Sequence, residues 1–541
     1  MSAVTPMPAL AERTFTAVIG KHVASFPDRP AVRDPDRALS YGAMYEESLA
    51  LAGGLARLGI AEGEHVLLML DNHLDGVLAW WALALTGRIE VPVNTAYRGS
   101  ILVHVVNNSK ARAIVIDAAY LPVLEESIDR LPLIERVIVR GAGMPSLPGR
   151  VRISRWEELA GPRANPVSLD PWSLMGILYT SGTTGPSKGV RVTQAHAYGY
   201  AAPAVLGRAV AEDVTLVTLP LFHIGGQWAG VYNSLISGGS SVVLPRFSAS
   251  SYWDDVRRYG CTYTLMLGTI ANFLYQQPPR RDDRDHAMKQ VLMVPVIAQM
   301  EEFKARFGID SIATAYGLTE GSTALIAPAG KTRPGAVGMP RPDFDVRLVD
   351  ANDVEVPRGT VGELIIRPQE PWSVMDGYHD MPEATVSAWR NQWLHTGDAF
   401  RIDPDGQYVF VDRVKDAMRR RGENVSSFEV EKEIMEHPAV LEAAVVGVPS
   451  AATEDDILAC VVLRPGAALS ADELLDFLER RLPYFMVPRY VDFLNELPKT
   501  PTAKVRKQAL RERGITPTCH DRPPKTGKRA APATAAAAGG N

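Results

Sequence analysis

Short apolar runs alternate with longer apolar or amphipathic stretches along the first 330 residues. Residues 65–70 (HVLLML) and 111–117 (ARAIVID) have the continuous apolar character of strands that are buried on both faces of a sheet. Residues 74–87 (LDGVLAWWALALTG) have the length of a helix and end at glycine, and further strands are expected at 89–94 and 136–141. Because strands separated by helices build parallel sheets with both faces covered, this part of the chain is predicted to be α/β.

The pattern changes after Ala336. Short strands between Gly, Pro and Asp turns predict a small antiparallel β unit, and they are expected at 345–350, 362–368 and 407–413. From about Lys415 a helix–strand–strand–helix pattern predicts a separate small domain. Its segments are an amphipathic helix at 427–440, strands at 441–448 and 457–465, and a helix at 470–482 that opens with a Ser470–Glu473 capping box.

Composition and charge narrow the classes of function. Hydrophobic residues make up 46% and charged residues 22% of the 541 residues, which is the balance of a globular protein. The net charge is 57 − 62 = −5, and this argues against a nucleic-acid binder or a general binder of anionic membranes. The three cysteines are far apart and suit neither a disulfide framework nor a metal site.

The start of the chain lacks the features of a signal peptide, and the apolar stretches are too short to span a bilayer. We therefore expect a cytoplasmic protein without a transmembrane segment, with peripheral membrane contact left open. The sequence is compatible with a homo-oligomer.

Residues 179–190 (YTSGTTGPSKGV) suit the binding of phosphate. The stretch is not a Walker A loop, because Gly185 and Lys188 are separated by two residues and no Ser or Thr follows the lysine. Its glycines let backbone N–H groups turn inward, its hydroxyls add donors and Lys188 adds positive charge. A strand is expected before it at 174–180 and a helix after it at 193–205. A flexible polar surface loop is the alternative reading.

Five further motifs follow in order, and with them the stretch resembles the phosphate loop of the adenylate-forming superfamily. That superfamily includes acyl-CoA synthetases, firefly luciferase and the adenylation domains of peptide synthetases. The resemblance covers roughly residues 10–515. The five motifs are LPLFHIGG (219–226), TAYGLTE (314–320), WLHTGD (393–398), VDRVKDAMRRRGENVSSFEVE (411–431) and LPKTPTAKVRK (497–507).

The resemblance implies a two-step reaction. A carboxylic acid attacks ATP to give an acyl-adenylate and pyrophosphate, and the thiol of coenzyme A then takes the acyl group and releases AMP, with Mg²⁺ assisting the first step. It also implies a large N-terminal domain (1–411) of two parallel-sheet lobes plus the β unit, a hinge (412–415) and a small mobile α+β domain (416–515). The Pro-, Lys-, Ala- and Gly-rich tail (516–541) is predicted to be disordered.

The resemblance assigns roles to the motif residues. Glu320 would bind Mg²⁺, a role that suits a carboxylate, and Thr319 would contact the α-phosphate. Tyr316 would lie against the adenine, Asp398 would accept hydrogen bonds from the ribose hydroxyls, and Arg413 would contact the ribose or phosphate edge. The residues expected to hold the β- and γ-phosphates are Thr180, Ser181, Gly182, Thr183, Thr184, Gly185 and Lys188.

Two further roles belong to the small domain. Lys504 would bridge the carboxylate and the α-phosphate during adenylation, although Ala503 precedes it where relatives carry glycine. Lys415 would be the pivot of a domain rotation that replaces Lys504 by the face around Gly422, past which the pantetheine arm of coenzyme A would run. Residues 419–421, three arginines, would bind the phosphates of coenzyme A or form an ordinary exposed run.

The acyl substrate is the least specified part. His223 matches a position near the mouth of the acyl pocket, and a purely structural role for it is equally open. Residues 293–300 (MVPVIAQM) lack the glycines that many relatives carry there, and the chain looks most like the subgroup with crotonobetaine/carnitine–CoA ligase. An acyl-AMP ligase that loads a carrier protein, and a degenerate adenylate binder, are the alternative functions.

Overall fold

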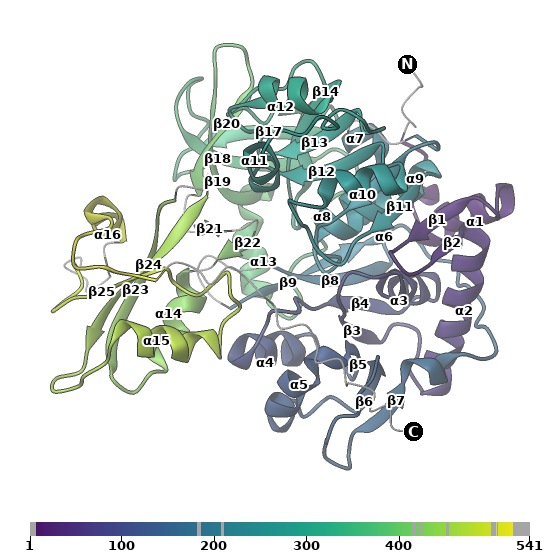
Figure 1. Cartoon of the computed structure of the whole chain (residues 1–541), viewed down its shortest axis with the longest axis horizontal. Helices are drawn as coiled ribbons and strands as arrows, with labels where there is room; N and C mark the ends of the chain where they lie inside the picture. The colour runs from purple at the N-terminus through teal and green to yellow at the C-terminus, as the bar shows by residue number, and fades with distance from the viewer. Residues whose placement is uncertain are drawn as a thin grey trace.

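Two large sheets, a small antiparallel sheet and a separate C-terminal unit make up the computed structural model of the chain (Figure 1). The described residues are 7–180, 186–206, 210–413, 418–420, 423–425, 427–450, 454–498, 505 and 507–522.

The first large sheet has seven strands in the order β7-β6-β5-β3-β4-β8-β9. All neighbours are parallel except β8 and β9, which form an antiparallel hairpin. The strands are β3 (His65–Met69), β4 (Ile89–Pro92), β5 (Ala113–Asp117), β6 (Arg136–Arg140), β7 (Arg152–Arg155), β8 (Leu174–Thr180) and β9 (Lys188–Thr193).

The second large sheet has nine strands in the order β16-β15-β14-β13-β12-β10-β11-β1-β2, parallel from β14 to β1 and antiparallel at both edges. Its strands are β1 (Pro30–Arg33), β2 (Ala38–Ser40), β10 (Val214–Val217), β11 (Ser240–Val243), β12 (Tyr263–Leu267), β13 (Gln290–Val294), β14 (Ser311–Leu318), β15 (Ser322–Ala327) and β16 (Met339–Pro340). The predicted α/β class is confirmed.

Helices lie between and around these sheets (Figure 1). An aromatic cluster joins the two lobes: Phe15 packs 5.1 Å from Trp80, and Trp80 packs 5.7 Å from Tyr232 between ring centroids. Large apolar side chains that pack edge to face in this way dominate a core. The helices are α1 (Phe15–Ser25), α2 (Tyr41–Arg57), α3 (Leu74–Leu85), α4 (Gly99–Asn108), α5 (Leu121–Ser127), α6 (Gln194–Ala201), α7 (Pro203–Leu206), α8 (Ile224–Gly226), the π-helical η5 (Gln227–Tyr232), α9 (Asn233–Ser237), α10 (Tyr252–Tyr259), α11 (Gly268–Gln276) and α12 (Met300–Phe307).

The predicted antiparallel β unit is present as a four-stranded sheet in the order β17-β18-β19-β20, followed in the chain by the small C-terminal unit. That unit carries α14 and α15 on one face of its sheet and α16 on the other, since alternate residues of β23 and β24 enter two different apolar clusters. The elements are β17 (Phe344–Val349), β18 (Gly362–Pro368), α13 (Pro382–Ala388), β19 (Leu394–Ile402), β20 (Tyr408–Arg413), β21 (Met418–Arg420), β22 (Glu423–Val425), α14 (Ser427–Met435), β23 (Val440–Pro449), β24 (Asp455–Leu463), α15 (Ala471–Glu479), β25 (Tyr490–Phe493), α16 (Lys507–Arg513) and β26 (His520–Asp521).

Four details differ from the sequence prediction. Strand β9, not a helix, follows the phosphate loop directly. The helix predicted over 193–205 is broken at Ala202, because Pro203 disfavours helical geometry in the residue before it. Helix α14 ends at Met435, and the tail prediction is wrong for residues 516–522, where β26 pairs with β25. The capping box of Ser470 and Glu473 is confirmed.

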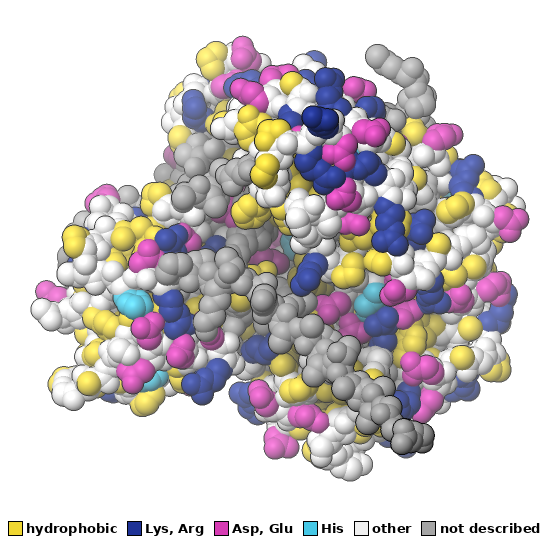
Figure 2. Space-filling model, viewed as in Figure 1, with side chains coloured by type: hydrophobic (Ala, Val, Ile, Leu, Met, Phe, Trp, Pro, Cys, Tyr) yellow, Lys and Arg dark blue, Asp and Glu magenta, His cyan; other side chains and the backbone are white. Residues whose placement is uncertain are grey.

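Lys, Arg, Asp and Glu side chains are intermixed over the face of the molecule shown in Figure 2. This distribution agrees with the small net charge of −5. Among the described residues, no helix combines the length and the apolar character that crossing a membrane requires.

Candidate active site

The hairpin of β8 and β9 positions both ends of the phosphate loop. Thr180, the last residue of β8, lies opposite Lys188, the first residue of β9. The predicted phosphate-binding residues Ser181, Gly182, Thr183, Thr184 and Gly185 lie outside the described residues. The two strands that flank the loop are antiparallel neighbours, whereas a Walker A loop leads into a helix N-terminus.

The hairpin of β14 and β15 positions Glu320. Thr319 and Glu320 form the turn between these strands, where Thr319 is buried and Glu320 is half-buried. The side-chain hydroxyl of Thr180 donates to Glu320 Oε1 at 3.0 Å, so the turn meets the phosphate loop at its first residue. The structure thus brings together predicted residues from two different sheets.

Tyr378 joins the same cluster and was missed by the sequence analysis. Its hydroxyl donates to Glu320 Oε1 at 3.1 Å, and its ring centroid lies 4.7 Å from Lys188 Nζ. The segment that carries it is fixed by backbone hydrogen bonds from Met375 to the Glu320 carbonyl and from His379 to the Gly189 carbonyl. Nothing in the local pattern around Tyr378 marks it, since only the folded chain brings this segment between β9 and Glu320.

Asp398 lies beside Tyr316, and the adenosine-binding roles of both residues stay predictions. The Tyr316 hydroxyl donates to Asp398 Oδ2 at 2.5 Å, and Asp398 is only 4% exposed. The preceding Gly397 has φ of +72°, a left-handed conformation that side chains disfavour, and its N–H donates to Glu363 Oε1 at 3.0 Å. The backbone of Arg413 pairs with that of Asp398 across β19 and β20.

His223 lies on a different element. It is exposed and caps α8, where its Nδ1 accepts a hydrogen bond from the Gly225 N–H at 3.1 Å. This contact gives the imidazole a structural role, and its place at the acyl pocket stays a prediction. Lys504, Lys415 and Gly422 lie outside the described residues, so their roles stay predictions too.

Arg420 does not suit the role considered for the arginine run. It is 4% exposed, donates to the Val487 carbonyl and lies 3.5 Å from Asp456. A buried, paired guanidinium holds the small domain together and is unable to reach a phosphate of coenzyme A at the surface.

The donor set suits the chemistry of Mg²⁺-ATP. Glu320 offers a carboxylate with hydroxyl groups beside it, a hard oxygen environment of the kind that Mg²⁺ prefers. Lys188 supplies positive charge at the phosphate loop, and the buried Asp398 offers acceptors for a diol. Among the described residues there is no cluster of three His, Cys, Asp or Glu side chains that would hold a metal without help from substrate oxygens.

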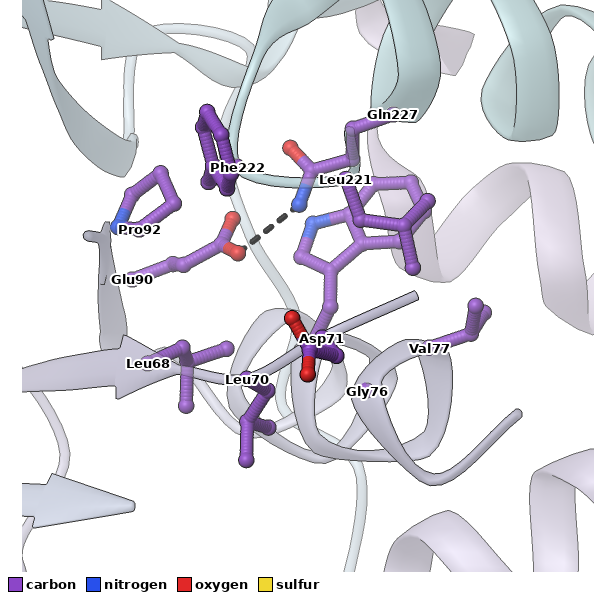
Figure 3. Close-up of a pocket in the computed structure, with 11 residues that line it drawn as sticks. Leu68, Leu70, Asp71, Gly76, Val77, Glu90, Pro92, Leu221, Phe222 and Gln227 are labelled. Atoms are coloured by element: carbon purple, nitrogen blue, oxygen red, sulfur yellow. Dashed lines mark hydrogen bonds between the residues drawn. The ribbon is translucent and has the colours of Figure 1, made fainter. Parts of the chain in front are cut away.

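A small cavity lies behind the loop that carries His223 (Figure 3). Its volume of about 20 Å³ holds one water molecule but no acyl chain. Glu90 and Gln227 face each other across it, and Gln227 Nε2 donates to Glu90 Oε1 at 2.7 Å (Figure 3). Burial raises the pKa of Glu90 to about 8, although the hydrogen bond from Gln227 lowers it. Glu90 is therefore protonated at neutral pH.

Glu90→Gln is expected to stabilise the protein more at pH 8.5 than at pH 5. An unfolded glutamate ionises near 4.5 and the folded Glu90 near 8, so between these values the folded state binds more protons and stability falls as pH rises. Glutamine keeps the acceptor for Gln227 but does not titrate. The free energy of unfolding of the variant, relative to that of the native chain, should therefore rise by about 2 to 4 kcal/mol from pH 5 to pH 8.5. Denaturant unfolding at both pH values measures this, with the exposed Glu126→Gln as control. An equal effect of Glu90→Gln at both pH values would refute it.

Two protein-family models match the chain. The model of the AMP-binding enzyme family matches residues 19–379, and the model of the AMP-binding enzyme C-terminal domain matches residues 429–504. The chain is 31% identical over 488 residues to crotonobetaine/carnitine–CoA ligases of Salmonella agona and Salmonella typhimurium. These alignments cover 88% of this chain and 93% of each relative.

Solved structures share the fold. A double mutant of o-succinylbenzoate CoA synthetase from Bacillus subtilis, bound with its product analogue OSB-NCoA, has a TM-score of 0.79 at 24% identity over 92% of this chain and 98% of that one. The same enzyme in complex with AMP has a TM-score of 0.64 at 24% identity over 91% and 97%. A benzoate CoA ligase from Burkholderia xenovorans has a TM-score of 0.68 at 27% identity over 92% and 99%.

The first family model alone matches more than half of the chain, and the second follows it along the chain. The chain belongs to the AMP-binding enzyme family of the adenylate-forming superfamily and is an acid–thiol ligase of the AMP-forming kind.

Proposed function

We propose that the chain uses Mg²⁺-ATP to activate a carboxylic acid at the site formed by Thr180, Lys188, Glu320, Tyr316 and Asp398, and then passes the acyl group to coenzyme A. The observation that carries this proposal is the contact of Glu320 with Thr180 and Tyr378, beside Lys188. In this cluster, a carboxylate that would bind a cation lies near a lysine that would bind phosphates. A carboxylic acid is already a nucleophile, so the site must chiefly neutralise charge on the phosphates.

Each residue has a role that follows from its surroundings. Lys188 would pair with the phosphates, and Tyr378 contacts both charged groups, since its ring lies beside the Lys188 ammonium and its hydroxyl donates to Glu320. Glu320 would hold Mg²⁺, which supplies positive charge to the leaving pyrophosphate when bound. Asp398 would accept hydrogen bonds from the ribose, held in place by Tyr316.

The test is the release of AMP and pyrophosphate from Mg²⁺-ATP across a panel of acids, with and without coenzyme A. The panel spans short, medium and long chains, aromatic acids, steroid side-chain acids and betaines, because relatives at 31% identity are named for crotonobetaine and carnitine. AMP formation that needs one acid class and coenzyme A would establish the function. Pyrophosphate without turnover on coenzyme A would favour a carrier protein as acceptor, and no release with any acid would favour a degenerate binder.

Asp398→Ala is expected to raise the KM for ATP about 10- to 100-fold, since hydrogen bonds to a charged group contribute about 1.5 to 3 kcal/mol. The dissociation constant of ATP, measured by calorimetry, should rise to the same extent because the ribose contact exists before reaction. The exposed Asp345→Ala on β17 is the control. Unchanged binding of ATP by Asp398→Ala would remove the ribose role.

A further inference from the structure

The hairpin that carries the phosphate loop has two faces, and only one of them belongs to the candidate active site. Thr180 and Lys188 lie opposite each other, and the next pair along the two strands is Tyr179 and Gly189. Because successive pairs of an antiparallel ladder point to opposite faces, Tyr179 points away from the face of Thr180 and Lys188. Thr180 donates to Glu320 on the first face, so the face of Tyr179 is the back of the site.

Helix α4 lies against this back face and contacts both ends of the loop. Asn108 Oδ1 accepts a hydrogen bond from the Tyr179 hydroxyl at 2.6 Å, and His104 Nε2 donates to the Ser187 carbonyl oxygen at 2.8 Å. Tyr97, two residues before the helix, is hydrogen-bonded to the Ser187 hydroxyl. One contact therefore holds the end of β8, and the others hold the residue that precedes β9.

The polar contacts of α4 are separate from the apolar packing of the helix. His104 and Asn108 are half-buried and stand four residues apart, so they share one side of α4. The helix is fixed in the core by a different stripe of fully buried residues, namely Ile101, Leu102, Val105 and Val106. Apolar packing thus accounts for the position of α4 without His104 and Asn108, and their hydrogen bonds serve the hairpin that they contact.

Tyr179 is fitted to its role as a donor at this face. A Cβ atom at Gly189 would lie 2.8 Å from Ile177 Cγ2 and 3.0 Å from Tyr179 Cζ, so the glycine makes room for the ring across the hairpin. Burial raises the pKa of Tyr179, and the negative charge of Asp380 raises it further. The hydroxyl therefore keeps its proton at neutral pH and remains a donor to Asn108.

We propose that His104 and Asn108 are positioning residues for the phosphate loop, which fix its two ends from the face opposite the phosphates. The proposal rests on the proposed function, which puts the β- and γ-phosphates of ATP on this loop. Both residues would act through Ser187 and Tyr179, since they lie on the back of the hairpin. A loop whose ends are already held loses less freedom when it binds a ligand, and this preorganisation raises affinity.

The test compares a ligand that has β- and γ-phosphates with one that lacks them. His104→Leu should raise the dissociation constant of Mg²⁺-ATP about three- to tenfold, which corresponds to the loss of one hydrogen bond. The dissociation constant of AMP should stay within about twofold, because AMP has no phosphate that would lie on the loop. Calorimetry on the full chain measures both constants. His104→Gln, which keeps an N–H donor, should restore most of the affinity for ATP.

Asn107→Leu is the matched control on the same helix. Asn107 Nδ2 donates to the Arg130 carbonyl oxygen at 2.9 Å, away from the loop. Its replacement removes a hydrogen bond from α4 to a backbone carbonyl, as His104→Leu does, and should change neither dissociation constant.

The other end of the loop is tested by Tyr179→Phe and Asn108→Leu. Each removes one partner of the same hydrogen bond, so each should weaken the binding of Mg²⁺-ATP and spare AMP. The double variant should bind ATP no more weakly than the weaker of the two single variants. Addition of His104→Leu should weaken the binding of ATP further, because it releases the opposite end of the loop.

Two kinds of failure can be told apart. If the native chain binds Mg²⁺-ATP but His104→Leu weakens ATP and AMP equally, the role of His104 is only structural and the proposal is overturned. Unchanged affinity for ATP in His104→Leu or in Asn108→Leu would remove that residue from the proposal, while the proposed function would stand. A native chain that does not bind Mg²⁺-ATP would refute the proposed function and this proposal together.

Discussion

Lys504→Ala is expected to lower the rate of pyrophosphate release about 10³-fold, the loss typical of removing one group that stabilises developing charge. Thioester formation from supplied acyl-adenylate should stay within about threefold, because the second step does not need a cation at the α-phosphate. Stopped-flow measurement of the two half-reactions separately checks both statements. The difference between the two half-reactions matters more than either rate, because a variant that merely folds poorly would lose both half-reactions.

Lys507→Ala is the matched control for this prediction. Lys507 belongs to the same motif, but its ammonium lies 2.6 Å from Glu431 and 2.6 Å from the Ser427 hydroxyl, inside the small domain. Its loss should lower the melting temperature and change neither half-reaction by more than about threefold. Adenylation that survives Lys504→Ala, or that depends equally on Lys507, would show the assignment of Lys504 to be wrong.

The sequence predicted those parts of the site that short motifs carry. Glu320 lies in the turn after β14 and Asp398 lies within β19, each inside one motif. Thr180, which donates to Glu320, and Tyr316, which donates to Asp398, also lie within motifs. Local sequence sufficed because each of these residues belongs to a short motif in or beside a strand, whose geometry is fixed nearby.

Local sequence patterns could not predict contacts between segments that are far apart in the chain. Tyr378 reaches Glu320 only because backbone hydrogen bonds join its segment to Gly189 and to Glu320, far apart in the chain. The sequence does not reveal that Arg420 is buried, because it stands in a run of three arginines and its partner Asp456 comes from another strand. The structure of residues 516–522 was missed for the same reason: the Pro-, Lys-, Ala- and Gly-rich composition of the tail predicted disorder, but β26 pairs with β25 and Arg522 forms ion pairs with Asp476 and Glu479.

The cavity at Glu90 and the contact at Glu429 show two different uses of buried carboxylates. Burial keeps Glu90 protonated, and it contributes a hydrogen-bonding group without charge. Glu429 is buried where the small domain meets the large one, and it accepts a hydrogen bond from the Ser187 hydroxyl. The difference lies in what each carboxylate faces: an amide inside one lobe, or a loop that belongs to another domain.

Glu320→Gln is expected to lower kcat/KM for ATP in the adenylation step about 10²- to 10³-fold, which is the magnitude for losing one electrostatic contact to the transition state. Glutamine keeps an oxygen that accepts from Thr180 and Tyr378, so the cluster should keep its shape while the negative charge is lost. The Mg²⁺ concentration for half-maximal rate should rise at least about tenfold, because a neutral amide is a poor ligand for a hard cation.

Binding of Mn²⁺ in the presence of a non-hydrolysable ATP analogue, followed by electron paramagnetic resonance, measures the cation without turnover. Tyr378→Phe is the informative companion, since it removes one hydrogen bond to Glu320 but keeps the ring beside Lys188. It should weaken the binding of Mn²⁺ about three- to tenfold, in line with the roughly 0.7 to 1.4 kcal/mol of an ordinary intramolecular hydrogen bond, because Tyr378 acts on the cation only through Glu320, and it should leave the melting temperature nearly unchanged. Unaltered Mn²⁺ affinity in Glu320→Gln would mean that the cation is held by the phosphates alone, and the carboxylate would then act only on the position of Thr180.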